Sequence, residues 1–353
     1  MNDLHYAVVV GINRYPAIGD LQGARGDAVR FRDWLVDSDG GAVPEGNVAL
    51  VTASKEEELT ADFMSAVPTR EVVNRALYEI HRAVAQAIAE LPGEQQFDAW
   101  QRTRLYLFLA GHGIGLADNS AGLLMANAAI DLLGNHVAVR PYLDWYVAAS
   151  PFREIVCFAD CCRTGYRGSP PFGPPFSGTT QDPEDVDCFV GFATALGDPA
   201  YEEQHPDPDL ARGHFTTALL DGLRGGAARN GLITSDSLSD YVVRHVEDRT
   251  QTMLVPQRPR FTKGNAPMLF AGELAVQAYP VKLCFPDGFR GWVQLRGGGP
   301  DQSPLRLHVD SGECVEKLTP GLYRATAESV NAADFRNGGF FEVMTGGGNG
   351  VQL

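Results

Sequence analysis

The sequence predicts an α/β protein with a doubly wound, mainly parallel sheet, helices on both faces of that sheet, and a small C-terminal all-β domain. Buried-strand patterns alternate with helical patterns up to residue 272. Two of the buried runs end in a histidine and in paired cysteines, which are unusual residues at the end of a core strand. After residue 274 the helical patterns stop and only short strand patterns remain. We therefore expect domains at residues 1–272 and 273–353.

The first domain has short apolar runs of β-forming residues, typical of strands that are buried on both faces. They lie at residues 6–12, 47–52, 105–110, 155–159 and 188–196. Helical periodicity fills the intervals between and after these runs. The expected helices cover residues 23–36, 70–91, 142–149, 214–224 and 235–248. Strands alternating with helices favour a parallel sheet with right-handed crossovers.

The second domain shows only strand patterns separated by Gly, Pro and Asp. The runs are residues 281–285, 292–295, 305–309, 323–327 and 340–343. This spacing is typical of a small β-sandwich. The turn-then-strand sequence L-T-P-G-L-Y at residues 318–323 resembles that of small bacterial immunoglobulin-like and PEGA-type modules.

Composition argues against several classes of function. The net charge of −15 disfavours nucleic-acid and anionic-membrane partners, which require basic surfaces. No apolar segment approaches the roughly 20 residues of a membrane span, and the chain begins without a signal-peptide pattern. Six cysteines in 353 residues do not form a disulfide framework. We expect a cytoplasmic protein that binds neither nucleic acid nor membrane.

His112 directly follows the run 105–110, and Cys162 follows the run 155–159. One crossover separates these strands, so we expect them to be adjacent and to bring both side chains to one edge of the sheet. A thiol becomes a good nucleophile when a histidine can take its proton. Glycines flank the histidine and leave backbone amides open to an oxyanion. The alternative is that Gly-His-Gly is a turn and the cysteines are small core residues.

Two sequence segments resemble the motifs of the caspase-like cysteine proteases, which include caspases, metacaspases and their bacterial relatives. They are L-F-L-A-G-H-G at residues 107–113 and F-A-D-C-C-R-T-G at residues 158–165. The separation from His112 to Cys162 is 162 − 112 = 50, as in caspases. The frame D-x-C-x-x-G, which ends at Gly165, is closer to that of metacaspases. The segments at residues 9–15, 21–28 and 214–223 are also similar to this family.

The resemblance implies that the protein is a cysteine endopeptidase acting through a thioacyl intermediate. Cys162 would attack the carbonyl, His112 would protonate the leaving amine, and the N–H groups of Gly113 and Cys162 would hold the oxyanion. Cys161 would fill the small-residue position of the motif. The resemblance requires no third acid and no cofactor.

We expect no metal site. The cysteines lack the C-x-x-C spacing that is typical of a zinc site. Some metacaspases bind calcium, and four acids in one loop are the only candidates: Asp182, Glu184, Asp185 and Asp187. We interpret this acidic loop as solvated.

The resemblance also implies cleavage after a basic residue. Asp160 of the D-x-C frame and Asp27 of the early segment match the acids that line the primary pocket of metacaspases, which cut after Arg or Lys. Two carboxylates in one pocket suit a guanidinium. The alternative is that Asp27 faces solvent from its helix and Asp160 forms a turn.

The predicted function is therefore cleavage of protein substrates after Arg or Lys by a regulated bacterial protease in a stress, cell-death or phage-defence pathway. Self-cleavage at Arg163, Arg167 or Arg212, or the action of an activating protease or regulatory protein, would switch it on. A different class of function remains open, namely a catalytically silent scaffold of the same fold whose C-terminal β module binds a protein partner. The intact His112 and Cys162 argue against the scaffold.

Overall fold

The computed structural model describes the chain at residues 2–165, 168, 171–178, 186–203, 205–207, 210–229, 231–271, 279–286, 288–297, 304–319, 321–328, 339–343 and 350–353. The chain divides into two compact units. The first comprises Met1–Thr217 and Val246–Pro267, and the second comprises Ala218–His245 and Met268–Leu353. The division into domains 1–272 and 273–353 stays a prediction.

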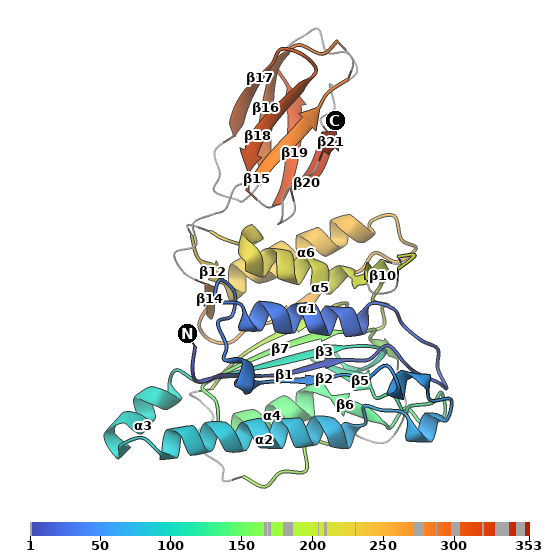
Figure 1. Ribbon diagram of the computed structural model, residues 1–353, viewed down its shortest axis with the longest axis vertical. Helices are drawn as coiled ribbons and strands as arrows, with labels where there is room; N and C mark the ends of the chain where they lie inside the picture. Colours follow the sequence, from blue (N-terminus) through green and yellow to red (C-terminus); the bar gives the residue numbers. More distant parts are fainter. Residues whose placement is uncertain are drawn as a thin grey trace. The chain divides into compact units, whose positions relative to one another are not determined.

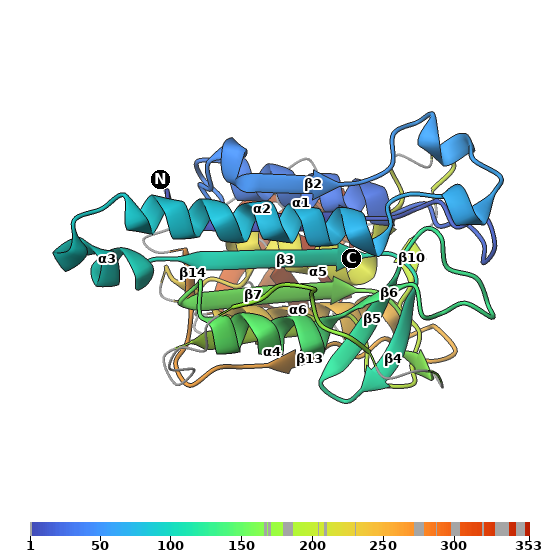
Figure 2. The same ribbon diagram turned by 90° about the horizontal axis from the view of Figure 1, so that it is seen from below.

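The first unit contains a six-stranded sheet in the order β13-β9-β7-β3-β1-β2 (Figure 2). Its strands are β1 (His5–Gly11), β2 (Val48–Val51), β3 (Arg104–Ala110), β7 (Glu154–Asp160), β9 (Asp187–Phe192) and β13 (Arg260–Thr262). All neighbours are parallel except β13, which pairs antiparallel with β9. The five strand patterns expected in the sequence all lie in this sheet, and the predicted fold class is confirmed.

Helices cover both faces of this sheet (Figure 1). Helix α1 (Ala24–Val36) lies on one face, and α2 (Arg70–Ala89) and α4 (Val139–Ala149) lie on the other. The remaining α-helices of the described chain are α3 (Gly93–Trp100), α5 (His214–Asp221) and α6 (Ser235–Thr250). None of the helices in the described residues is both long and apolar enough to cross a membrane.

Close packing of α1 against the sheet depends on a glycine and on stacked aromatic rings. A Cβ added to Gly11 of β1 would lie 2.5 Å from the Cβ of Ala28, so only glycine permits this approach. The rings of Phe31 and Phe108 stack with centroids 4.6 Å apart, and both side chains are fully buried. On the other face, apolar residues of α2 such as Leu77 and Val84 are equally buried.

The strands β3 and β7 pair in register over their whole length, from Arg104 beside Glu154 to Ala110 beside Asp160. The Arg104 guanidinium also donates a hydrogen bond to the Glu154 carboxylate at 2.7 Å, which supports this register at the start of both strands. Because the two strands end side by side, the residues that follow them emerge at the same edge of the sheet.

A second, smaller sheet in the first unit begins where the main sheet ends. Its order is β6-β5-β4-β8, and its strands are β4 (Gly113–Ala117), β5 (Ser120–Leu124), β6 (His136–Ala138) and β8 (Thr164–Gly165). β4 starts directly after His112, and β8 starts one residue after Arg163. Two further strands, β10 (Glu202–Glu203) and β11 (Arg212–Gly213), pair antiparallel. These short strands were not anticipated from the sequence.

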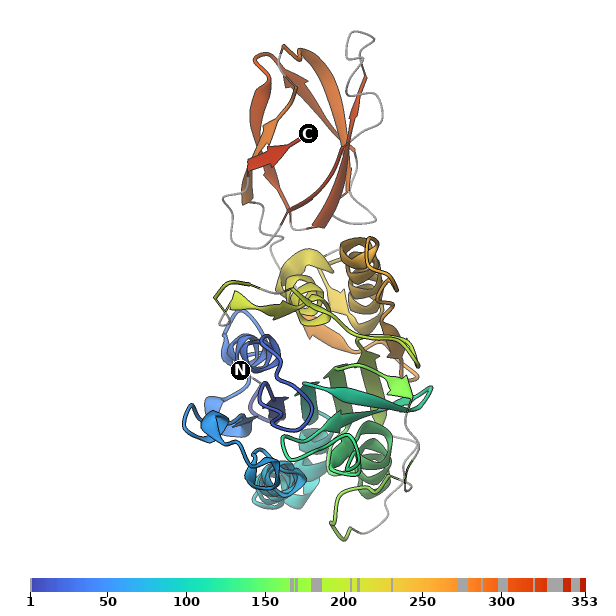
Figure 3. The same cartoon turned by 90° about the vertical axis from the view of Figure 1, so that its right-hand side faces the viewer.

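In the described residues of the second unit from 279 onward, all regular secondary structure is β-strand, as predicted (Figure 3). One sheet has the order β18-β15-β21 and the other has the order β17-β16-β19-β20. The strands are β15 (Tyr279–Cys284), β16 (Gly291–Gly297), β17 (Leu305–Val309), β18 (Glu313–Leu318), β19 (Gly321–Ala327), β20 (Gly339–Val343) and β21 (Gly350–Gln352). They share a core that includes Leu283, Val293 and Val309. The same unit contains the short pair β12 (Ile233–Thr234) and β14 (Leu269–Ala271).

Truncation of Phe31 should destabilise the first unit. We expect Phe31→Ala to lower the free energy of unfolding by about 3–5 kcal/mol, because it leaves a cavity between α1 and the sheet. Guanidinium unfolding followed by circular dichroism measures the effect. The control is Phe97→Ala in α3, where the side chain is 59% exposed and the expected change is within about 0.5 kcal/mol. Equal losses in the two variants would contradict this account of the core.

Candidate active site

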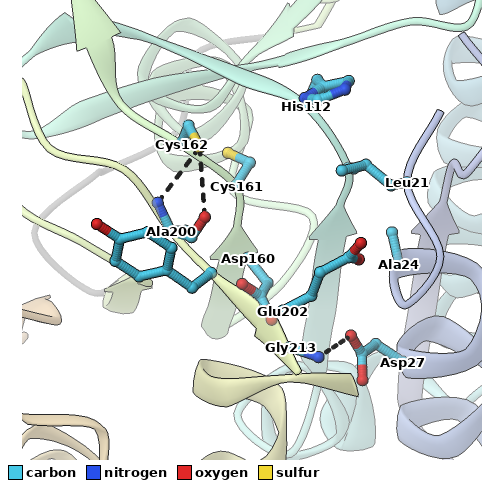
Figure 4. Close-up of a pocket in the computed structure, with 12 residues that line it drawn as sticks. Leu21, Ala24, Asp27, His112, Asp160, Cys161, Cys162, Ala200, Glu202 and Gly213 are labelled. Carbon is cyan, nitrogen blue, oxygen red and sulfur yellow. Dashed lines mark hydrogen bonds between the residues drawn. The ribbon is translucent and has the colours of Figure 1, made fainter. Parts of the chain in front are cut away.

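A pocket of about 150 Å³ lies in the first unit at the carboxyl ends of β3 and β7 (Figure 4). The side chains that line it include His112, Cys162, Asp27 and Asp160. Four residues that the sequence singled out, from three distant segments of the chain, are therefore brought together in one pocket.

The Cys162 thiol is half-buried and points to the backbone of Ala200. The Ala200 N–H donates to Sγ at 3.3 Å, and the thiol donates to the Ala200 carbonyl oxygen with an Sγ···O distance of 3.6 Å (Figure 4). Burial raises the pKa of this thiol, and the Ala200 N–H opposes that shift. The thiol is therefore protonated at neutral pH, and its hydrogen bonds go to Ala200.

The neighbouring Cys161 is a core side chain. It is 2% exposed, and burial raises the pKa of its thiol well above the ordinary value. A neutral, inaccessible thiol is a poor nucleophile. Of the two adjacent cysteines, Cys162 is the better placed to react.

His112 is held by the backbone of Gly19 and by the side chain of Tyr15. Its Nε2 lies 2.9 Å from the carbonyl oxygen of Gly19, and its backbone N–H donates to the Tyr15 hydroxyl at 3.1 Å. The Tyr15 hydroxyl in turn donates to the Leu124 carbonyl at 3.0 Å, and its ring packs edge-on against the imidazole. Because a carbonyl can only accept, the Nε2 carries the hydrogen and Nδ1 is left as the basic nitrogen.

Gly111 shapes the approach to His112. Its φ of +156° falls in the region that favours glycine, and a Cβ at this position would collide with the Tyr15 hydroxyl. The glycine therefore allows the buried tyrosine to reach the His112 backbone.

Asp27 and Asp160 are both buried, at 2% and 8% exposure. Asp27 accepts hydrogen bonds from the Gly213 N–H at 2.8 Å and from Arg30 Nη2 at 2.7 Å. Asp160 accepts from the Thr216 hydroxyl at 2.6 Å and from its N–H at 3.2 Å. The alternative that Asp27 faces solvent is wrong, because its side chain points into the pocket (Figure 4).

The pKa values of both carboxyl groups are raised. Burial raises the pKa of Asp27, and the charge of Asp160 raises it further against the opposing charge of Arg30. Burial also raises the pKa of Asp160, and its bonds from Thr216 lower it. A Cβ on Gly213 would overlap a carboxylate oxygen of Asp160 and lie 3.0 Å from one of Asp27. The backbone at Gly213 therefore passes between the two acids.

Glu202 is a third acid in the pocket, and the sequence reasoning did not identify it. Its carboxylate accepts hydrogen bonds from the backbone N–H groups of Gln22 at 3.1 Å and Gly23 at 2.8 Å. Its charge is one of the causes that raise the pKa of Asp160. The only signal in the sequence was the acid-rich stretch between β9 and α5. Pairing of β10 with β11, which sets Glu202 beside Gly213, turns that stretch back to the pocket.

Gly113, predicted to help hold the oxyanion, starts β4 and lies close to the backbone of Cys162. A Cβ on it would overlap the Cys162 carbonyl oxygen and lie 2.6 Å from Cys161 Sγ. The geometry requires glycine here, while the oxyanion role of Gly113 and Cys162 stays a prediction.

Arg163 does not fit its predicted role as a self-cleavage site. Its side chain is 1% exposed, and its guanidinium donates to backbone carbonyls at Thr194, Ala117, Asp118 and Ser120. A protease cannot reach a residue held in this way without unfolding the site. Arg212 lies exposed in β11, and Arg167 lies outside the described residues.

The acidic loop is only partly described. Asp182, Glu184 and Asp185 lie outside the described residues, and Asp187 is buried and pairs with Arg153 at 3.0 Å. Within the described ranges, no group of three or more His, Cys, Asp or Glu side chains is arranged to hold a metal ion.

No family model matches the chain. The chain is similar to a protein named as a probable protease from a Desulfuromonadales bacterium, with 28% identity over 254 residues, which make up 68% of this chain and 28% of that protein. The chain therefore spans little more than a quarter of the length of this relative.

Solved structures show weaker similarity. Caspase-1 of Spodoptera frugiperda has 15% identity and a TM-score of 0.41, with 76% of this chain and 92% of that chain covered. Its pro-form has 15% identity, a TM-score of 0.40, and coverage of 74% and 87%. A protein of Geobacter sulfurreducens has 14% identity, a TM-score of 0.41, and coverage of 73% and 92%. These scores are low. The predicted α/β fold class rests instead on the observed sheet, in which His112 and Cys162 follow adjacent parallel strands.

Thiol labelling should distinguish the two adjacent cysteines. In the folded chain we expect iodoacetamide to modify Cys162 and to leave Cys161 intact, because Cys161 is only 2% exposed whereas Cys162 is half-buried. Since burial raises the pKa of Cys162, the rate should be low at neutral pH and rise about tenfold per pH unit as the thiolate forms. Peptide mapping by mass spectrometry measures both sites.

The control is labelling in guanidinium, where the two cysteines should react alike. Equal labelling of Cys161 in the folded chain would contradict its assignment as a core residue.

Proposed function

We propose that this chain is a cysteine endopeptidase that cleaves protein substrates after Arg or Lys. The observation that carries the proposal is the composition of one pocket, where a thiol and an imidazole border three carboxylates. The thiol and imidazole supply a nucleophile and a general acid and base. The carboxylates supply a site for a cation beside them.

The charge of the pocket favours arginine as the recognised side chain. Asp27, Asp160 and Glu202 line it, and Arg30 is paired with Asp27 from the side. A guanidinium remains charged and offers five N–H donors in a plane, so it can bond to several carboxylate oxygens at once. An acidic side chain would meet like charges and lose its hydration. Lysine would satisfy the charge with fewer directed bonds.

The mechanism follows from the bonds of His112. With Nε2–H donated to the Gly19 carbonyl, Nδ1 takes the proton of Cys162, and the thiolate attacks the carbonyl carbon of the scissile peptide bond. The N–H groups of Gly113 and Cys162 stabilise the oxyanion of the tetrahedral intermediate. The imidazolium then protonates the leaving amine, and water hydrolyses the thioester. Before attack, the thiol must exchange its hydrogen bond with Ala200 for one with His112.

The name of the bacterial relative, a probable protease, supports peptide-bond cleavage in general. Control of the enzyme by self-cleavage at Arg167 or Arg212, by another protease or by a regulatory protein is part of this proposal. So is a role in a bacterial stress, cell-death or phage-defence pathway. The substrate protein would present a basic residue at an accessible site.

Turnover of short fluorogenic peptides tests the activity. We expect cleavage after Arg or Lys and none after Asp. Cys162→Ala should lower kcat at least about a thousandfold, because no other group can form the thioester. The matched control is Cys161→Ala, which should keep kcat within about threefold of the parent if Cys161 only packs in the core.

An arginyl chloromethyl ketone should also label Cys162, as read by peptide mapping. If neither turnover nor labelling occurs in the folded protein, the proposal is wrong and the silent-scaffold alternative is favoured. Full activity of Cys162→Ala would instead contradict the choice of nucleophile.

Neutralising one acid should weaken recognition of arginine. We expect Glu202→Gln to lower kcat/KM for arginyl peptides roughly 10- to 100-fold, since a hydrogen bond to a charged group contributes about 1.5–3 kcal/mol. Steady-state kinetics measure the effect. Glu203→Gln is the matched control, because this neighbouring acid is exposed and does not line the pocket. Equal losses in both variants would contradict the role of Glu202.

The affinity for a cation should depend on pH in a defined direction. The raised pKa values of Asp27 and Asp160 mean that both carboxyls are partly protonated at mildly acidic pH. A bound cation favours the ionised forms, so protons leave on binding and affinity rises as the pH increases toward neutrality. Titration of benzamidine at several pH values measures this slope. Asp27→Asn should flatten it, and an unchanged slope would contradict the coupling.

A further inference from the structure

Arg163, the residue after the nucleophile, is unusual because its charge is buried among backbone carbonyls. Its Nη2 donates to the carbonyl oxygens of Ala117 and Asp118 at 2.6 Å each and of Ser120 at 3.1 Å. Its Nη1 donates to the Thr194 carbonyl at 3.2 Å. Among the described residues, no ion pair with a carboxylate is recorded for this guanidinium.

The ring of Phe192 covers the guanidinium, with 4.4 Å between the guanidinium carbon and the ring centroid. Burial of a charge without a paired carboxylate is costly unless all of its donors are used, and Nε of Arg163 has no hydrogen-bond partner. A smaller apolar residue would fill this space at lower cost. The arrangement therefore points to a role beyond stability.

The carbonyls that Arg163 binds belong to segments that surround the nucleophile. Residues 117–120 form the turn of the hairpin β4–β5, which starts at Gly113 after the catalytic histidine. Thr194 follows β9 and leads to the segment that holds Cys162. The backbone of Arg163 binds the same segment, because its N–H donates to Asp198 O at 3.1 Å and its carbonyl accepts from Gly197 N–H at 2.8 Å.

The hairpin and the nucleophile loop touch through their backbones. β4 pairs with β8 at Ile114 beside Thr164 and Gly115 beside Gly165. A Cβ on Gly115 would overlap the Arg163 carbonyl oxygen. This contact fixes one end of the hairpin, and the guanidinium fixes the turn at the other end. A shift of the hairpin would move the Gly113 N–H relative to the Cys162 N–H.

We propose that Arg163 is a positioning residue that holds the Gly113 and Cys162 amides in the geometry of an oxyanion site. The inference rests on the proposed function, in which these two amides stabilise the tetrahedral intermediate. Arg163 touches neither substrate nor reacting atoms in this role. It acts through the hairpin turn and the segment after β9.

Lysine cannot replace arginine in this role. The carbonyl oxygens come from two separate segments, and a planar guanidinium reaches both with two nitrogens, whereas an ammonium offers one nitrogen. Arg163→Lys keeps the charge and loses one set of bonds. Removal of one oxyanion donor lowers kcat about 100- to 1,000-fold. A partial displacement of one such N–H donor should therefore lower kcat roughly 10- to 100-fold.

The experiment compares the full-length parent, Arg163→Lys and Arg104→Lys. Arg104 is the matched control, a buried arginine at the opposite ends of the same strands, 5% exposed and paired with Glu154. We expect Arg163→Lys to lower kcat 10- to 100-fold for an arginyl peptide with KM within about threefold, and Arg104→Lys to leave kcat within about threefold.

Two binding probes separate positioning from general damage. An arginyl peptide aldehyde forms a tetrahedral adduct with the thiol and needs the oxyanion site, so its affinity for Arg163→Lys should fall in parallel with kcat. Benzamidine occupies only the acidic pocket, so its affinity should stay within about twofold. A proportional loss for both probes would show general disruption and overturn the proposal.

A second variant covers the case in which Arg163→Lys does not fold. Phe192→Leu removes the ring over the guanidinium and keeps its hydrogen bonds, and we expect a smaller loss of kcat and of aldehyde affinity with benzamidine binding retained. If both variants fold and keep the kcat of the parent, the inference is wrong and the proposed function stands. The same holds if Arg163→Lys does not fold and Phe192→Leu keeps the kcat of the parent. Absence of turnover by the parent chain would instead overturn the proposed function and, with it, the inference.

Discussion

The paired endings of β3 and β7 determine where the functional groups of the pocket lie. Seven residues of each strand pair in register, and the last pair sets Ala110 beside Asp160. His112 and Cys162 each follow two residues later, so one ladder of backbone hydrogen bonds places both. A slip of one residue would turn the buried side chains of a strand to the opposite face of the sheet, which the stacked ring of Phe108 resists.

The burial of acidic side chains in the pocket has an electrostatic cost. Asp27, Asp160 and Glu202 face a common space, and burial disfavours the charged forms of Asp27 and Asp160. The protein offsets part of this cost with hydrogen bonds to backbone N–H groups, a threonine hydroxyl and a single arginine at the side. In the function proposed above, a basic side chain of the substrate would supply the missing positive charge. Its binding would then offset the remaining cost of burying the two aspartates.

Local sequence patterns were sufficient to predict the five parallel strands of the main sheet and the residues that follow two of them, but not the antiparallel edge strand β13. The apolar runs around residues 107 and 157 identify two strands. The histidine and the cysteine that follow them are notable because such residues are unusual at the end of a core strand. Glu202, the Gly19 carbonyl and the Ala200 backbone could not be foreseen. They reach His112, Cys162 and the pocket through tertiary contacts between distant loops, and two of them contribute only main-chain atoms, which every residue carries.

The buried position of Arg163 also could not be predicted from local sequence patterns. The sequence predicted a self-cleavage site here, which would require an exposed side chain, yet the hairpin β4–β5 binds the guanidinium through the carbonyls of its turn. Strands such as β8, β10 and β11 span only two residues each, below the length at which alternation can be recognised. Their pairing is decided by neighbours in space.

The hydrogen bond from Gly213 to Asp27 joins residues 186 positions apart in the chain. A ribosome adds His112 and Cys162 before it adds Gly213, and chains emerge and fold from the N-terminus. A nascent chain therefore carries the imidazole and the thiol before the backbone that lies between Asp27 and Asp160 exists. In the function proposed above, the chain could recognise a basic side chain only after most of the first unit has left the ribosome.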